Sequence, residues 1–337
     1  MIDLKCCPST LAEGFGTYSP KASKALFDGR KVSPFLGFSI DGLKKSDEAA
    51  KAAGRISVSG VQEKFPAVVE KGVIRLARDG ERSTHILKPA PWDETISTRR
   101  YIPANENLTM QIASQVYGIS TAANGLCFSL DGQAVYITRR FDILPDGTKL
   151  PMEDFASVIG RSEEKMGISF KYSGSYEEIG IGIRKNIQAW MVDMERFFNM
   201  VVFNYIYGNG DAHLKNFSLV RIGQDYRLAP AYDLINTYLH VQGDDFAIEG
   251  GLSQIITKSD IYENTGHPCR KDFELFGLHI GLGKKRLSRV LDRYDSIPDA
   301  AKALIGRSFL TEKLKRSYLR IVKERTARFN RYSDNMV

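Results

Sequence analysis

The sequence predicts an α+β fold with two lobes, a small β-rich lobe over residues 1–150 and a larger helical lobe over residues 151–337. Two patterns indicate this division. Short apolar runs separated by turn residues dominate the first part, whereas helical periodicity dominates from about residue 153 onward. A chain of 337 residues is also long enough to form two compact lobes.

The first lobe is expected to contain five strands and one helix. The apolar runs that predict strands cover residues 65–69, 73–76, 84–88, 126–130 and 134–139. Lys71-Gly72 and Asp131-Gly132 are turn dipeptides, so each joins its flanking strands as a hairpin. A helix is expected near residues 105–117, with apolar residues at helical spacing and a stop at Gly118.

The second lobe contains a long apolar helical pattern over residues 190–205, directly before a glycine-flanked polar segment. Residues 161–185 are rich in Gly, Ser, Lys and Glu, and we expect a flexible surface loop there. Residues 309–337 predict a basic amphipathic helix. Its basic side is either simply solvated or meets DNA or the acidic flank of a partner.

The polar segment over residues 208–216 holds Asp211 and, five residues later, Asn216; Asp233 follows within Ala-Tyr-Asp-Leu. Protein kinases use this order: the first Asp accepts the proton of the substrate hydroxyl, while Asn and the second Asp hold Mg²⁺. Oxygen side chains suit that role because Mg²⁺ prefers oxygen ligands. The alternative is a polar loop built from Asx turns.

Two residues upstream fit the same chemistry. Lys88 ends a short apolar strand, a costly place for a lysine unless it is paired or faces a polar cleft. Glu106 opens the helix eighteen residues later and is available to pair with it. The alternatives are a solvated strand end for Lys88 and a glutamate favoured by the helix dipole for Glu106.

Several segments together resemble the successive motifs of the HipA family of toxin kinases. They are Ile-Ser-Val-Ser-Gly-Val-Gln-Glu-Lys, His-Ile-Leu-Lys-Pro, Ala-Asn-Glu-Asn, Arg-Phe-Asp at 140–142, Met-Glu-Asp-Phe at 152–155, Asn-Gly-Asp-Ala-His-Leu-Lys-Asn and Leu-Ala-Pro-Ala-Tyr-Asp-Leu. The resemblance runs from about residue 30 to about residue 325. Roughly one hundred residues that precede these motifs in long HipA proteins are lacking, so the chain looks most like the short HipT branch. The resemblance implies a bilobal, protein-kinase-like (HipA-like) fold.

The resemblance also implies roles for individual residues. Asp211 would be the catalytic base, with His213 and Lys215 facing the phosphates, and Asn216 and Asp233 would hold Mg²⁺. Lys88 would anchor ATP and Glu106 would orient it. The other ATP-binding positions would be Ser59, Gly60, Val61, Gln62 and Lys64 in a phosphate-covering loop, and Glu153 and Phe155, whose backbone would meet the adenine. Ser57, Ser59 or both would be autophosphorylated.

The implied function is a serine/threonine protein kinase that uses ATP and Mg²⁺ and acts as the toxin of a toxin–antitoxin system. Its substrate would be an aminoacyl-tRNA synthetase, with tryptophanyl-tRNA synthetase favoured over glutamyl-tRNA synthetase, so that translation stops. Its partners would be a HipB-like helix-turn-helix antitoxin, through which it meets DNA indirectly, and a separate HipS-like small protein. The alternatives are a small-molecule kinase and an inactive nucleotide-binding repressor subunit.

Composition sets further expectations. No apolar run approaches the roughly 20 residues of a membrane span and no signal-peptide pattern is visible, so we expect a cytoplasmic protein without membrane contact. The four cysteines show no disulfide or zinc spacing. Residues 18–22 lack the His and Cys found there in some relatives, so we expect a plain loop without a metal. The histidines at 85, 240, 267 and 279 are expected to be structural.

Overall fold

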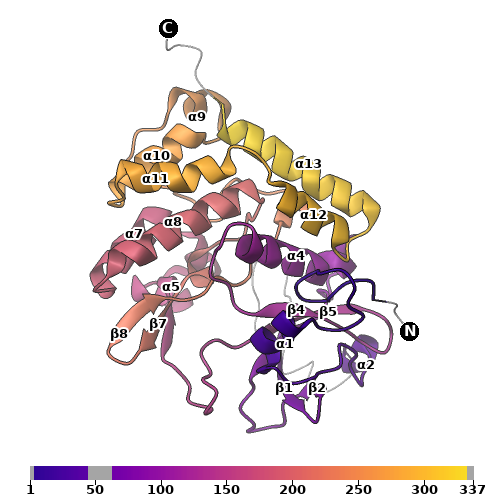
Figure 1. Cartoon of the computed structure of the whole chain (residues 1–337). Helices are drawn as coiled ribbons and strands as arrows, with labels where there is room; N and C mark the ends of the chain where they lie inside the picture. The colour runs from indigo at the N-terminus through magenta and orange to yellow at the C-terminus, as the bar shows by residue number, and fades with distance from the viewer. Residues whose placement is uncertain (1–3, 45–62, 332–337) are drawn as a thin grey trace. The chain divides into compact units, whose positions relative to one another are not determined.

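The computed structural model describes residues 4–44 and 63–331, and Figure 1 labels its elements. Its backbone divides into two compact units, neither of which is continuous in sequence. Unit 1 comprises residues 1–116, 120–148 and 300–315, and unit 2 comprises residues 117–119, 149–299 and 316–337.

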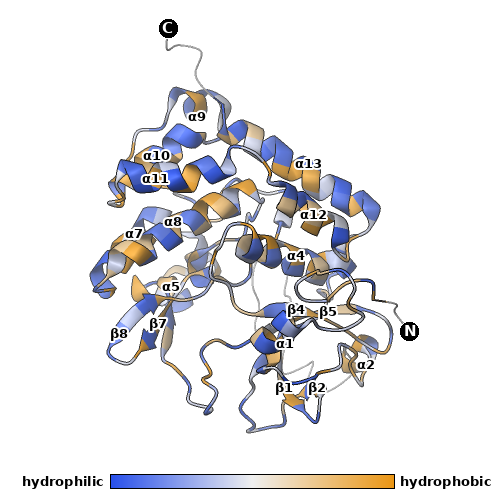
Figure 2. Cartoon of the chain, in the orientation of Figure 1, coloured by the Kyte–Doolittle hydropathy of each residue, from blue (hydrophilic) through white to orange (hydrophobic). Residues whose placement is uncertain are grey.

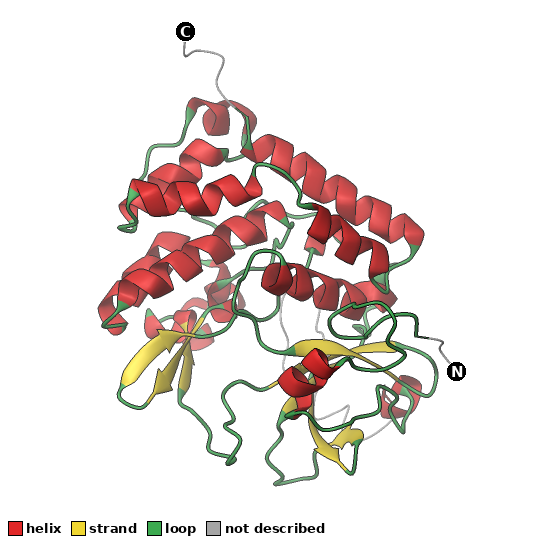
Figure 3. Cartoon of the chain, viewed as in Figure 1, coloured by secondary structure: helices red, strands yellow, loops and turns green. Residues whose placement is uncertain are grey.

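Unit 1 is built on a five-stranded antiparallel sheet with strand order β2-β1-β3-β5-β4. The strands are β1 (Phe65–Glu70), β2 (Val73–Leu76), β3 (His85–Lys88), β4 (Asn124–Phe128) and β5 (Ala134–Arg139). Each lies within two residues of its expected range, because short apolar runs bounded by turn residues mark strands clearly. Figure 3 shows this sheet in yellow.

The helices of unit 1 include α1 (Pro20–Phe27), α2 (Ile40–Lys44), the 3-10 turn η1 (Arg99–Tyr101) and α4 (Ile102–Gln115). The loop expected at residues 18–22 is wrong, because Ser19 caps α1 through the amide of Ala22 and Pro20 begins the helix. The core of unit 1 is apolar and packs α1 against the sheet through residues such as Phe27, Leu87 and Ile137.

Unit 2 contains a three-stranded antiparallel sheet, in the order β6 (Met152–Asp154), β7 (Ser218–Ile222) and β8 (Asp225–Leu228). Helices form the rest of this unit, as the red ribbons of Figure 3 show. They are α5 (Phe155–Val158), α6 (Glu163–Met166), η2 (Ile168–Tyr172), α7 (Tyr176–Asn186), α8 (Trp190–Ile206), η3 (Leu214–Asn216), η4 (Thr237–Leu239), α9 (Asp260–Thr265), α10 (Arg270–His279), α11 (Lys284–Leu291) and η5 (Asp292–Tyr294). Two further helices, α12 (Asp299–Arg307) and α13 (Glu312–Phe329), each run through the boundary between the units.

The surface loop expected over residues 161–185 is wrong. That stretch contains α6, η2 and α7. A capping box formed by Ser175 and Glu178 begins α7, and Tyr176, Ile179 and Ile183 are buried at helical spacing. The polar composition of the stretch concealed these three apolar positions, whose i, i+3, i+7 spacing is the helical signal.

Helix α13 is amphipathic, as expected, and its ribbon in Figure 2 alternates between polar and apolar turns. Leu314, Tyr318, Val322 and Phe329 are buried along one side. Arg325 is buried with them and donates to Asp245 Oδ1 at 2.9 Å, so its charge is neutralised inside unit 2. The exposed basic side of α13 is therefore formed by other residues of the helix.

Within the described part of the chain, every helix is too short or too polar to cross a lipid bilayer. The four cysteines are buried free thiols. Three of the four histidines expected to be structural have partners at hydrogen-bond distance: His85 contacts Leu26 O at 2.8 Å, His267 contacts Asp245 at 2.7 Å and His279 contacts Glu177 at 2.6 Å. Burial lowers the pKa of the fourth, His240, to about 4.

Candidate functional site

The polar segment after α8 is held by its glycines and by Thr237. Gly208 has φ +67°, a left-handed conformation that glycine adopts without strain. The amide of Gly210 donates to Thr237 Oγ1 at 2.9 Å, and the same hydroxyl donates to Gly208 O at 3.1 Å. A Cβ atom at Gly210 would lie 3.1 Å from Thr237 Oγ1, so the close approach favours glycine. The segment is therefore a fixed turn.

Asp211 follows this turn and is partly exposed. Its Oδ1 accepts a hydrogen bond from the Tyr172 hydroxyl at 3.0 Å, and its amide donates to Asn209 Oδ1 at 3.2 Å. The side chain of Asn209 in turn donates to Asn204 Oδ1 at 3.0 Å and to Asp233 O at 3.4 Å. One asparagine therefore links the segment of Asp211 to the segment of Asp233.

A second link is provided by Tyr232. Its hydroxyl donates to Lys215 O at 2.8 Å and lies 2.6 Å from Ser218 Oγ. The next residue, Asp233, has φ +56°, a rare conformation for a residue other than glycine. Backbone strain of this kind costs of order 1–3 kcal/mol and occurs most often at functional sites. Unit 2 thus holds the segments of Asp211, Asn216 and Asp233 together through hydrogen bonds.

The donor set fits a hard divalent cation. Asn216 is buried at the end of η3, and its Oδ1 has no hydrogen-bond partner among the residues that the structure describes. A buried carbonyl oxygen without a partner costs about 1–3 kcal/mol. A Mg²⁺ ion held by Asn216 and Asp233 would remove that cost, because both side chains supply oxygen.

His213 and Lys215 lie in the same segment but in different environments. The His213 ring is buried and meets the edge of the Tyr172 ring, with 5.2 Å between the ring centroids. Lys215 is half exposed; its Nζ lies 3.8 Å from Asp154 Oδ2 and 5.6 Å from the centroid of the Phe170 ring. In this structure the Lys215 ammonium therefore faces a carboxylate of unit 2.

In unit 1, β3 and α4 bring Lys88 and Glu106 together. Lys88 Nζ lies 2.7 Å from Glu106 Oε1, and the two side chains are only 4% and 2% exposed. The ammonium also lies 5.2 Å from the centroid of the Tyr136 ring. A buried ion pair is weak evidence for stability, because the cost of desolvating the charges offsets their attraction. A functional role explains this buried ion pair better than a contribution to stability does.

The remaining candidate residues are less informative. The loop positions Ser57, Ser59, Gly60, Val61 and Gln62 lie outside the described residues, and Lys64 is exposed just before β1. Glu153 is exposed in β6 and pairs with Leu219 of β7. The Phe155 side chain is fully buried and its amide donates to Phe217 O at 2.9 Å.

Two kinds of site residue were absent from the sequence expectations. Tyr172, which contacts the Asp211 carboxylate, lies 39 residues upstream in a stretch expected to be a loop, and no spacing rule connects the two. Asn204 and Asn209 connect the segments of Asp211 and Asp233. Asn204 could have been found from the sequence, since a polar amide in an otherwise apolar helix needs a hydrogen-bond partner.

The chain is similar to known proteins in sequence and in fold. A family model described as the HipA-like C-terminal domain matches residues 56–301. A relative from Sinorhizobium fredii, named "Putative kinase Y4dM", is 34% identical over 221 residues, which cover 59% of this chain. The match covers 49% of the relative, so this chain spans about half of that protein's length.

Two solved structures have the same fold. HipA in the Shewanella oneidensis complex of HipA, HipB and operator DNA gives a TM-score of 0.62 at 21% identity, covering 82% of this chain and 65% of that one. The Helicobacter pylori proinflammatory kinase CtkA gives a TM-score of 0.53 at 16% identity, covering 82% of this chain and 91% of that one. The mixed α+β fold is thus the one seen in HipA and CtkA. Because the family model matches well over half of the sequence, the chain belongs to the HipA-like C-terminal domain family.

Proposed function

We propose that the chain is a serine/threonine protein kinase that transfers the γ-phosphate of ATP, with Mg²⁺, to a protein hydroxyl. The observation that carries the proposal is the linked set in unit 2: Asp211 partly exposed, Asn216 with a buried oxygen lacking a partner, and Asp233 in a strained conformation on a segment tied to both. Asx turns in a plain polar loop would not account for a buried amide oxygen left without a donor.

In the proposed mechanism Asp211 accepts the proton of the substrate hydroxyl as that oxygen attacks the γ-phosphorus. Tyr172 donates a hydrogen bond to Oδ1 of Asp211 and so orients the carboxylate. Asn216 and Asp233 would hold Mg²⁺, which would supply positive charge to offset the charge on the phosphate oxygens. Residues 151–337 carry this machinery, while residues 1–150 supply Lys88, oriented by Glu106, to the ATP phosphates.

We further propose that the kinase is a toxin. Its substrate is an aminoacyl-tRNA synthetase. Tryptophanyl-tRNA synthetase is the favoured candidate and glutamyl-tRNA synthetase the second, and phosphorylation of the synthetase stops translation in the cytoplasm. A HipB-like helix-turn-helix antitoxin is the proposed partner on DNA, supported by the fold shared with a HipA that is complexed with HipB and operator DNA. A HipS-like small protein is the second proposed partner. Autophosphorylation at Ser57, Ser59 or both regulates the enzyme.

The test is incubation of the full chain with ATP labelled at the γ-position, Mg²⁺, and either purified tryptophanyl- or glutamyl-tRNA synthetase or a cell lysate. The proposal expects label on one synthetase and loss of its aminoacylation activity. Label on small solutes alone would point to a small-molecule kinase, and no transfer to anything would reject kinase activity. Intact-mass and peptide mass spectrometry of the kinase itself tests Ser57 and Ser59.

A further inference from the structure

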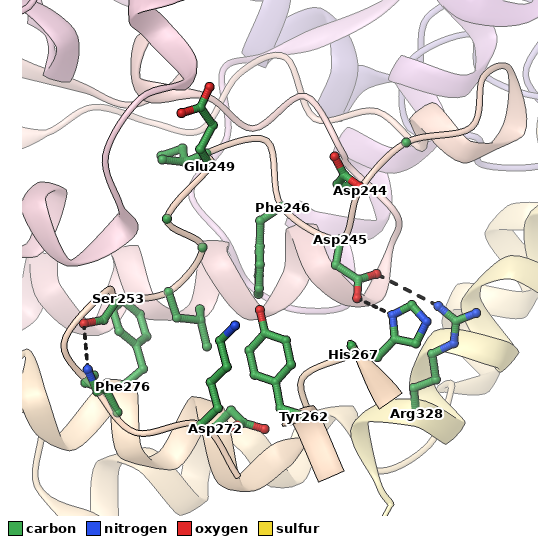
Figure 4. A pocket seen from close by; sticks show the side chains of 18 of the residues that line it. Asp244, Asp245, Phe246, Glu249, Ser253, Tyr262, His267, Asp272, Phe276 and Arg328 are labelled. Carbon is green, nitrogen blue, oxygen red and sulfur yellow. Dashed lines mark hydrogen bonds and ion pairs between the residues drawn. The ribbon is translucent and has the colours of Figure 1, made fainter. Parts of the chain in front are cut away.

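Unit 2 contains an open groove of about 610 Å³ that the proposed chemistry does not use. Figure 4 shows it from close by. The segment from Tyr238 to Lys258 forms most of the lining, and residues of α9, α10 and α13 complete it. Four carboxylates line the groove against two basic side chains, Lys258 and Arg328.

Two of the four carboxylates are engaged by the fold. Asp245 contacts Arg325 at 2.9 Å and His267 at 2.7 Å, and Arg328 lies 4.0 Å away. Asp272 accepts hydrogen bonds from the amide and hydroxyl of Ser259, both at 2.8 Å. These acids hold the groove's own elements together, so they are not available to a ligand.

The other two, Asp244 and Glu249, are exposed and form neither an ion pair nor a side-chain hydrogen bond with any residue in the ranges 4–44 and 63–331. Phe246 lies between them in Figure 4, with its ring directed toward Tyr262. Carboxylates beside aromatic faces attract cations through charge and through the ring quadrupole. The chain already uses this surface in that way, since Lys258 Nζ lies 4.5 Å from the centroid of the Tyr262 ring.

Two independent contacts connect the groove wall to residues that neighbour Asp211. A Cβ atom at Gly210, the residue before Asp211, would lie 3.2 Å from Asp244 O and 3.4 Å from the Tyr238 ring, so the groove wall packs directly on this turn. On the other side, the amide of Glu249 donates to Tyr172 O at 2.8 Å, and the hydroxyl of Tyr172 reaches Asp211. A chain segment lying in the groove would therefore end close to the proposed base.

We propose that this groove binds an extended, lysine- or arginine-rich segment of the protein that carries the acceptor hydroxyl. Asp244 and Glu249 pair with its basic side chains. The inference rests on the proposed kinase function, since it names the substrate class of that site. The protein as a whole carries a net charge of +7, so it repels basic peptides in general and any preference for them must arise locally.

The test measures binding without phosphate transfer. A fluorescein-labelled ten-residue peptide with one central serine and four lysines is titrated by fluorescence anisotropy against the full-length Asp211→Asn protein. A matched peptide has glutamates in place of the lysines. The lysine peptide should bind at least about tenfold more tightly than the glutamate peptide at low salt, and the difference should shrink at 300 mM salt as charge attraction is screened.

Asp244→Asn together with Glu249→Gln should weaken binding of the lysine peptide about tenfold, since each partly exposed charge pair contributes up to roughly fivefold. Both substitutions keep side-chain size at exposed positions, so folding is not at risk. Glu263→Gln is the matched control: an exposed acid on α9 outside the groove lining, expected to leave the affinity unchanged.

Equal affinity for the two peptides, or unchanged binding in the double variant, would overturn the groove assignment whether or not the chain is a kinase. Failure of the kinase proposal appears separately, as absence of phosphate transfer by the wild-type chain to any peptide or protein.

Discussion

Removing the hydroxyl of Tyr172 isolates one hydrogen bond to the proposed base. Tyr172→Phe keeps the ring, which meets His213 edge to face, and deletes only the donor that lies 3.0 Å from Asp211 Oδ1. A hydrogen bond to a charged group contributes about 1.5–3 kcal/mol. If the transition state loses that amount, kcat falls roughly ten- to a hundredfold.

Whether kcat or KM changes distinguishes a positioning role for Tyr172 from a packing role. Because Tyr172 is proposed to act through Asp211, kcat should fall while KM for ATP stays within about twofold.

The assay is steady-state phosphate transfer, with thermal melting in parallel. Tyr172→Leu serves as the comparison, since it removes the ring packing as well and should lower the melting temperature. An unchanged kcat in a folded Tyr172→Phe protein would refute the reasoning; so would a loss of kcat that simply tracks lost stability.

Three further outcomes are expected. Asp233→Ala should weaken nucleotide binding by tenfold or more with Mg²⁺ present and little without it, measured by isothermal titration; equal losses would make Asp233 structural. Burial lowers the pKa of His85 to about 4, so the unfolded chain binds more protons than the folded chain between pH 4 and 6.5. The contribution of neutral His85 to the free energy of unfolding is therefore complete above pH 6.5, and it decreases by about 2 kcal/mol from pH 7 to 5. Urea unfolding at the two pH values should show a smaller decrease for His85→Gln than for the wild-type chain. Glu106→Gln should destabilise the fold by up to about 3–5 kcal/mol, because it removes the carboxylate charge that lies 2.7 Å from the buried Lys88 ammonium, whereas a double variant with Lys88→Met should regain stability but stay inactive.

The spacing of apolar residues and the turn residues between them predicted the strands of unit 1 and helix α8. The strands of unit 1 are short apolar runs, and turn dipeptides such as Lys71-Gly72 separate some of them, so β1 to β5 were placed within two residues. The helix preceding Asp211 was equally clear, because its apolar residues recur at helical spacing over 190–205 and α8 covers 190–206. Helix α7 was missed because three buried positions were weighed less than a polar composition.

Long-range contacts could not be predicted in the same way. The order of Asp211, Asn216 and Asp233 is visible in the sequence because the chemistry requires those residue types at those positions. The contact of Tyr172 with Asp211 depends on how η2 packs in unit 2, which no spacing rule encodes. The groove beside Asp244 likewise depends on how α13 packs against α9 and α10, which lie more than 30 residues earlier in the sequence.

The central claim is that Asp211 is the base for phosphoryl transfer, and one rate comparison tests it most directly. Phosphate transfer from labelled ATP is measured for the wild-type chain, for Asp211→Asn, and for Asp225→Asn, a control at an exposed aspartate of β8. Loss of a general base costs about 10²–10⁴-fold in rate. The account predicts a loss of that size for Asp211→Asn, with an unchanged melting temperature, and wild-type rates for the control. Transfer at the wild-type rate by a folded Asp211→Asn protein would contradict it.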